Sequence, residues 1–244
     1  MSNLVILDDS VTAFTDPTQL QGVYGTFWNE GLPTTIAIAP MALGTSGIPS
    51  IPLAKQDSNG RYRISENKTL CDYLGVMAEQ RLVEICQYGF HGTIDEFAIE
   101  DDLLLQQKIE EGQAELQRAF PHVDSQTVCV PPRHISQIAI QLLSEYNFNI
   151  VAFNDDATRV QHRKALNDSR ALFYYGDRFF SQANASLAEK VIKHLATSDY
   201  VILRMSYTTF FDANMPTPAL AEWQAFCKAI LAVRDITIDT IAYI

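Results

Sequence analysis

The chain has 244 residues, of which 47% are hydrophobic and 19% are charged, so it is long enough to bury a large core. Its formal net charge of -11 and sequence pI near 4.8 argue against a nucleic-acid-binding protein, because neutralising phosphates requires clustered Lys and Arg. No apolar stretch approaches the roughly 20 residues that span a bilayer, so we expect no membrane association.

The N-terminus and the cysteines favour a cytoplasmic location. Residues 1–3 carry no positively charged side chain, and the apolar run at 4–7 is too short for the core of a signal peptide. The four cysteines show no CxxC spacing, so we interpret them as reduced, buried residues and expect neither a disulfide framework nor a zinc clip. They are Cys71, Cys86, Cys129 and Cys227.

Short apolar runs alternate with helical patterns along the chain, without a repeat, a low-complexity segment or a linker. Strands are predicted at residues 3–7, 34–39, 82–87, 126–130, 149–153, 171–175, 200–204 and 236–241. Helices are predicted at 18–29, 68–79, 99–119, 136–146, 187–196 and 217–233. Between the second strand and the second helix, residues 41–63 form a predicted Gly/Pro/Ser-bearing loop, which we expect to shape the mouth of a cleft.

This alternation predicts parallel strands joined by crossover helices, hence an α/β barrel or a doubly wound sheet. We expect one domain over residues 1–244. In both architectures the functional site forms at the carboxyl ends of the strands. The polar side chains at or just beyond predicted strand ends are therefore the first candidates: Asp8, Asp9, His91, Arg133 and Arg204.

The first predicted strand runs straight into Asp8 and Asp9. Adjacent side chains of an extended chain point to opposite sides, so one carboxylate could bind a cation while the other reaches a water beside it. The alternative for two consecutive Asp residues is a solvated turn or a helix cap.

His91 and Asp95 lie four residues apart in the segment GFHGTIDEF. One turn of helix would place both on the same face, and an imidazole and a carboxylate so arranged suit zinc or another divalent ion. Gly89 and Gly92 would permit a tight backbone around the imidazole. The alternative is a structural hydrogen bond between His and Asp that satisfies both groups.

Two more segments belong to the same predicted edge of the sheet. The double proline that ends the strand at 126–130 stiffens the chain. It presents Pro132, Arg133 and His134 as candidates for a substrate cleft, with an ordinary strand-to-helix turn as the alternative. Arg204 ends the run YVILR, where it could be a solvated cap or bind an anion.

Taken in order, LVILDDSV, GFHGTIDEF, CVPPRHIS and YVILRMSY resemble the motifs of the NodB-homology polysaccharide deacetylases of the carbohydrate esterase family 4 type, over nearly the whole chain. The resemblance implies a distorted or incomplete (β/α) barrel. It implies Asp8 as general base and a divalent metal ion, zinc as the first expectation, held by Asp9 and His91. Asp95 stands where the family motif has its second His and is the third implied ligand.

In such a site the metal ion would polarise an acetyl carbonyl and lower the pKa of a bound water, whose proton Asp8 would take. Besides Asp95, two further positions depart from the family pattern. Val130 stands where the family has an Arg, and Arg204 stands where it has a general-acid His. An Arg is a poor acid at neutral pH, since its pKa exceeds about 12, but Arg204 could stabilise an oxyanion or bind an anionic substrate.

Three functional hypotheses remain from the sequence. The first is a metal-dependent hydrolase of a C–N amide bond, acting on an N-acetylated sugar or a related small amide. The second is a carbohydrate-binding or regulatory relative without turnover, which the missing acid at Arg204 favours. The third is an unrelated α/β protein in which the motifs coincide, since a fold does not fix a function. The oligomeric state is not predicted.

Overall fold

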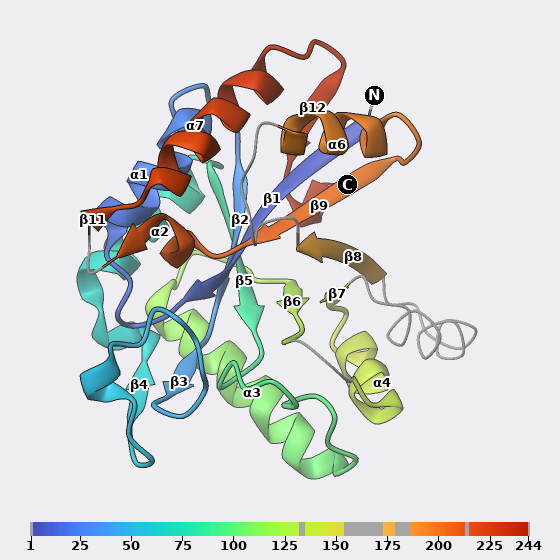
Figure 1. The fold of residues 1–244 in the computed structure, drawn as a ribbon. Helices are drawn as coiled ribbons and strands as arrows, with labels where there is room; N and C mark the ends of the chain where they lie inside the picture. Colours follow the sequence, from blue (N-terminus) through green and yellow to red (C-terminus); the bar gives the residue numbers. More distant parts are fainter. Residues whose placement is uncertain (1, 132–134, 154–172, 179–185, 213–214, 244) are drawn as a thin grey trace.

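Eight parallel strands form the main sheet of the computed structural model, which describes residues 2–131, 135–153, 173–178, 186–212 and 215–243 (Figure 1). The strand order is β12-β1-β2-β5-β6-β7-β8-β9, and β9 pairs in turn with β1. The strands are β1 (Ser2–Val11), β2 (Thr34–Ile38), β5 (Val83–Tyr88), β6 (Thr127–Cys129), β7 (Asn149–Phe153), β8 (Phe173–Arg178), β9 (Tyr200–Met205) and β12 (Ile236–Asp239).

The pairing of β1 with three neighbours closes the sheet. Residues 2–5 pair with β12, residues 7–11 pair with β2, and residues 3–8 pair with β9. The ring is irregular, because the β1–β2 register shifts between Asp8 and Val11 and because β5 and β6 share only a short ladder. The fold is therefore a distorted parallel α/β barrel, as the sequence predicts.

The helices lie outside this barrel, with α1, α2 and α7 grouped on one side and α3 and α4 on another (Figure 1). The α1 helix begins at Asp16, whose carboxylate accepts the Thr18 N–H, and Pro17 fits its first position. No helix in the described part of the chain is both long and apolar enough to cross a membrane. The helices are α1 (Pro17–Trp28), α2 (Lys68–Glu79), α3 (Asp102–Ala119), α4 (Gln137–Glu145), α6 (Ser186–Leu195) and α7 (Pro218–Leu231).

Alternation along β1 separates an inner from an outer core. Val5 and Leu7 belong to an inner cluster that includes Cys86 and Tyr88 of β5, whereas Leu4 and Ile6 pack with residues of the surrounding helices. Because successive side chains of a strand point to opposite faces, Asp8 follows the outward set and Asp9 follows the inward set.

The structure differs from two possibilities that the sequence raised for local structure, a turn at Asp8 and Asp9 and a helical turn at residues 91–95. The first strand continues through both Asp residues to Val11, because each carboxylate has buried hydrogen-bond partners and needs no solvated turn. Residues 91–95 form no helix. Gly89 and Gly92 have φ of +55° and +68°, the left-handed region that favours glycine, and Glu96 bonds the backbone between them.

The predicted loop at 41–63 contains a small hairpin, in which β3 (Met41–Leu43) pairs antiparallel with β4 (Arg61–Arg63). The remaining short elements are η1 (Leu53–Lys55), η2 (Ile64–Glu66), η3 (Tyr207–Phe210), β10 (Phe211–Asp212), β11 (Met215–Pro216) and η4 (Ile241–Tyr243). Of these, η3 directly follows β9 and so lies at the carboxyl end of the barrel.

Candidate functional site

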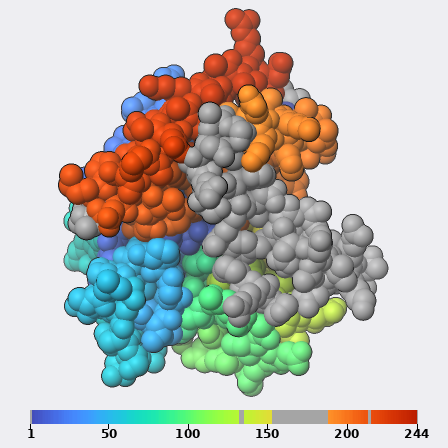
Figure 2. Space-filling view, viewed as in Figure 1, coloured from blue at the N-terminus to red at the C-terminus, as the bar shows by residue number. Residues whose placement is uncertain are grey.

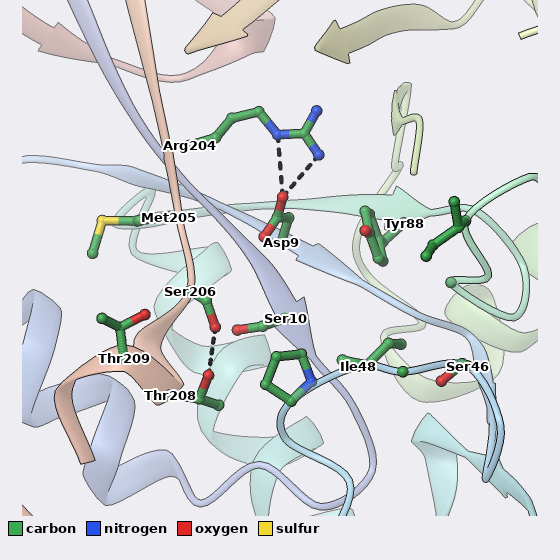
Figure 3. Close-up of a pocket in the computed structure, with 14 residues that line it drawn as sticks. Asp9, Ser10, Ser46, Ile48, Tyr88, Arg204, Met205, Ser206, Thr208 and Thr209 are labelled. Atoms are coloured by element: carbon green, nitrogen blue, oxygen red, sulfur yellow. Dashed lines mark hydrogen bonds and ion pairs between the residues drawn. The ribbon is translucent and has the colours of Figure 1, made fainter. Parts of the chain in front are cut away.

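A pocket of about 330 Å³ opens beyond the carboxyl ends of β1, β5 and β9. In Figure 2, dark blue atoms of the first residues are seen recessed between the light blue segment near residue 50 and the orange segment after residue 200. Figure 3 shows how the lining side chains converge. They are Asp9, Ser10, Ser46, Gly47, Ile48, Pro49, Tyr88, Gly92, Ile94, Arg204, Met205, Ser206, Thr208 and Thr209.

A buried ion pair between Asp9 and Arg204 forms one wall of this pocket (Figure 3). Nε and Nη2 of Arg204 donate hydrogen bonds of 3.2 and 2.8 Å to Asp9 Oδ2. Arg204 is 0% exposed and Asp9 is 6% exposed. The strand register explains the contact, since Arg204 lies opposite Leu7 on β1 and Asp9 is the next inward side chain. Each charge neutralises the other inside the barrel.

Asp8 lies on the other face of β1, against the helix layer. Its Oδ2 accepts hydrogen bonds from the Tyr24 hydroxyl at 2.5 Å and the Tyr207 N–H at 2.9 Å. Its Oδ1 accepts the N–H and the hydroxyl of Ser10. Burial raises the pKa of Asp8 from 3.8 to about 6, against the lowering effect of these hydrogen bonds. Asp8 therefore ties β1 to α1 and η3, and it does not line the pocket.

His91 is held by the hairpin that follows β2. Its Nδ1 lies 3.0 Å from the Met41 carbonyl oxygen, which can only accept, so Nδ1 carries the proton. The ring packs on Phe90 with centroids 4.4 Å apart. Partial burial lowers the pKa of His91, which favours the neutral imidazole. His91 lies beside the turn that walls the pocket but is not among the lining residues.

Glu96, rather than Asp95, organises the turn after β5. Asp95 is exposed, whereas Glu96 is 2% exposed and accepts the backbone N–H groups of Phe90, His91 and Gly92. The ammonium of Lys108 on α3 lies 2.9 Å from the same carboxylate. A glutamate that receives three backbone donors fixes the path of the chain, a role that the spacing of His91 and Asp95 does not reveal.

The comparisons with known proteins bear on this barrel. No protein-family model and no curated protein sequence matches the chain. A 4-alpha-glucanotransferase from Thermococcus litoralis aligns with 99% of it at a TM-score of 0.60 and 14% identity, but the chain spans only 39% of that protein. A family 4 acetyl xylan esterase from Clostridium thermocellum, solved with a cobalt ion, covers 99% of the chain at a TM-score of 0.57 and 12% identity, with 89% of its own length aligned.

A structure described as a pseudoenzyme of carbohydrate esterase family 4, from Bacillus anthracis, also aligns over 99% of the chain. Its TM-score is 0.57, its identity is 6%, and 64% of its own length is covered. The chain has the carbohydrate esterase family 4 fold. At these identities the likeness concerns the esterase fold, and the chemistry of this chain rests on its own residues.

On this esterase fold, the residues that the sequence assigns to a metal ion are not arranged as a ligand set. In the described ranges, no three His, Cys, Asp or Glu side chains gather as metal ligands would. Asp9 is bonded to a guanidinium, and Asp95 is exposed on its turn. A divalent cation beside Arg204 would be repelled by the fixed positive charge. The described donor set therefore does not fit a divalent metal ion.

Pro132, Arg133 and His134 lie outside the described residues. Val130, which the sequence resemblance places at the family's Arg position, is buried, and its carbonyl oxygen lies 3.5 Å from Arg204 Nη2.

The sequence analysis did not identify Ser46, whose buried side chain is the polar group of the pocket best suited to bind a ligand. Ser46 is 6% exposed, and its hydroxyl has no hydrogen-bond partner among the described residues although it lines the pocket. An unpaired buried hydroxyl is unfavourable, so a ligand atom that bonds it gains affinity. Only the length of the 41–63 loop pointed to this region.

Proposed function

We propose that this chain binds a neutral carbohydrate in the pocket beside Asp9 and Arg204, without a metal ion and without deacetylating it. The observation that carries the proposal is the buried pair itself, in which Arg204 Nη2 and Asp9 Oδ2 are 2.8 Å apart. Removing Arg204 from Asp9 to admit a metal ion would leave a guanidinium buried without its counter-charge, which is strongly unfavourable.

The pocket also lacks a suitably placed acid and base among its described lining residues. Its charged members are Asp9 and Arg204, and they neutralise each other. Arg204 keeps its proton at any physiological pH, so it cannot donate one to a leaving amine. Asp8, the base that the resemblance implies, is turned toward Tyr24. These positions support binding over hydrolysis.

The hydroxyl-rich lining favours a carbohydrate as ligand. The polar side chains of the pocket include Ser10, Ser46, Ser206 and Thr209. The Ser10 hydroxyl donates to Asp8 and the Ser206 hydroxyl is bonded to Thr208, but each oxygen can still accept, and Ser46 can both donate and accept. A volume of about 330 Å³ lies at the small end of the range for ligand sites. A sugar carries hydroxyls of the same dual character and no charge, so it matches a pocket whose one ion pair is internally neutral.

Binding of N-acetylglucosamine, glucose and xylose, measured by ligand-observed NMR with and without EDTA, tests this proposal. We expect at least one sugar to bind equally in both conditions. Replacing Ser46 by Ala should weaken that binding about five- to tenfold, because one hydrogen bond is lost. Ser125→Ala is the matched control, since Ser125 also has a buried hydroxyl without a partner but lies outside the pocket.

A second measurement addresses the hydrolase predicted from the sequence. We expect no acetate release from N-acetylglucosamine or chito-oligosaccharides, with or without added zinc or cobalt. Acetate release that EDTA abolishes, and that an Asp9→Ala variant lacks, would establish a metal-dependent deacetylase and overturn the proposal. Loss of sugar binding in EDTA would contradict its metal-free part.

A further inference from the structure

A second hollow of about 600 Å³ adjoins the pocket. The two share Pro49 and Thr208 in their linings, so a ligand can pass from one to the other without leaving the surface. We call this second hollow the Leu53 groove. Its lining residues are Phe14, Gln19, Pro49, Ser50, Ile51, Pro52, Leu53, Gln56, Tyr207, Thr208, Phe211 and Asp212.

Several polar side chains of the Leu53 groove are already bonded within the protein. The Ser50 hydroxyl donates to the Ser10 carbonyl oxygen at 2.7 Å and lies 2.9 Å from Thr12 Oγ1. The Gln56 amide donates to the Ile51 carbonyl oxygen at 2.9 Å. These groups have partners and gain little from a ligand, in contrast to the unpaired hydroxyl of Ser46 in the pocket.

The hydroxyls at the junction of the two hollows are engaged as well. Tyr207 Oη donates to Thr15 Oγ1 at 3.0 Å, and Thr208 Oγ1 lies 2.6 Å from Ser206 Oγ (Figure 3).

Apolar side chains form much of the remaining surface of the groove, beside the polar Gln19 and the exposed Asp212. Leu53 is 85% exposed at its rim, and Ile51 is 2% exposed beneath. Phe14 is half-buried and fixed edge-on against Tyr62, with ring centroids 4.6 Å apart. Phe211 is also half-buried. These apolar side chains stay in contact with water unless a ligand covers them, and covering them is favourable in proportion to the apolar area.

Building on the carbohydrate site proposed above, we propose that the ligand is amphiphilic. Its sugar occupies the pocket at Ser46, and an apolar substituent, an alkyl or acyl chain, lies in the Leu53 groove. We place the sugar in the pocket because the Ser46 hydroxyl there has no partner among the described residues. We place the apolar substituent in the groove because its Ser50 and Gln56 side chains are already hydrogen-bonded within the protein. A second sugar would have the Asp212 carboxylate as an acceptor there, but it would leave the apolar side chains of Leu53, Phe14 and Phe211 poorly covered.

Methyl and hexyl glycosides of N-acetylglucosamine, glucose and xylose, compared by isothermal titration below their micelle concentrations, test the inference. We expect the hexyl glycoside of the sugar that binds to have about tenfold or higher affinity than its methyl glycoside, because several methylene groups become buried. Leu53→Asp should remove most of this gain and leave methyl-glycoside binding unchanged. Leu103→Asp is the matched control, since Leu103 is 78% exposed on α3 and belongs to neither hollow.

The outcomes separate this inference from the proposed function. Equal affinity of methyl and hexyl glycosides, with Ser46-dependent binding intact, overturns the apolar substituent and leaves the carbohydrate site standing. A gain from a disaccharide that matches or exceeds the gain from the hexyl group assigns the groove to a second sugar and also overturns it. Hexyl binding that depends on Leu53 but not on the sugar or Ser46 contradicts the carbohydrate site instead. Failure of every glycoside to bind removes both.

Discussion

The Tyr24 hydroxyl joins the first helix to the first strand by donating a 2.5 Å hydrogen bond to Asp8 Oδ2. Both groups are fully buried, and burial raises the pKa of Tyr24 well above its usual value, so the phenol stays protonated and keeps donating. The Tyr207 N–H donates to the same oxygen at 2.9 Å. One carboxylate oxygen thus connects β1, α1 and η3, and η3 supplies residues of the pocket.

Asp8 predicts a pH dependence of stability. Its pKa is about 6 in the folded protein and about 3.8 when unfolded, so between these values the folded state holds more protons. The stabilisation is therefore present at low pH and is lost as the pH rises through about 6, amounting to roughly 3 kcal/mol. Urea unfolding from pH 3.5 to 7.5 measures it. Asp8→Asn should flatten the slope, while exposed Asp235→Asn should not. Equal slopes in wild type and Asp8→Asn would refute the assignment.

The Asp9–Arg204 pair predicts strong coupling between two positions. Arg204→Met leaves Asp9 charged and buried, which should lower the free energy of unfolding by about 3–5 kcal/mol. In an Asp9→Leu background the same substitution should cost far less, because no uncompensated carboxylate remains. A double-mutant cycle by urea unfolding gives the coupling energy. Additive effects of the two substitutions would show that the pair is not formed in solution.

Glu96 predicts a localised loss of order in the turn after β5. Glu96→Gln keeps the size of the side chain but removes the ion pair to Lys108 and one carboxylate acceptor. We expect a loss of about 1–3 kcal/mol and faster amide hydrogen exchange at Phe90, His91 and Gly92. Exposed Glu100→Gln serves as the control. Unchanged exchange at the three amides would contradict their hydrogen bonds to the Glu96 carboxylate.

Gly92 predicts that two walls of the pocket are in contact. Its φ is +68°, and a Cβ there would meet Ile48 Cδ1 at 2.5 Å. Gly92→Ala should therefore cost more than Gly31→Ala, a control with φ of +71° and nothing within 4 Å of the added carbon. Thermal unfolding of both variants isolates the steric part. Adding Ile48→Ala to Gly92→Ala should recover part of the difference, and its failure to do so would argue against this contact.

The sequence predicts most of the barrel because its signals are local. Periodicity places the helix at 68–79 and the strand at 149–153 with the bounds that the structure has. The same alternation brings Asp9 and Arg204 to neighbouring strand ends. It cannot predict their ion pair, because two residues 195 positions apart meet only through the register of β1 against β9.

The opposite directions of Asp8 and Asp9 follow from strand geometry and were expected. What each carboxylate meets depends on distant elements: Tyr24 on α1 for one and Arg204 on β9 for the other. The role of Ser46 is harder still to predict from the sequence, because it depends on the lack of a hydrogen-bond partner among the described residues of the folded chain. Glu96 went unnoticed because a metal-ligand spacing describes side chains, whereas its partners are backbone N–H groups.

Barrel closure between β1 and β9 has a consequence for how the protein is made. The edge of β1 that pairs with β9 has no partner strand until residues 200–205 have been synthesised, so it is exposed while the nearly 200 residues between them leave the ribosome. An unpaired, apolar strand edge invites association with other chains. Contacts across such a sequence separation also slow folding. Nascent chains of this protein should therefore depend on chaperones more than those of a barrel-sized protein built from local hairpins.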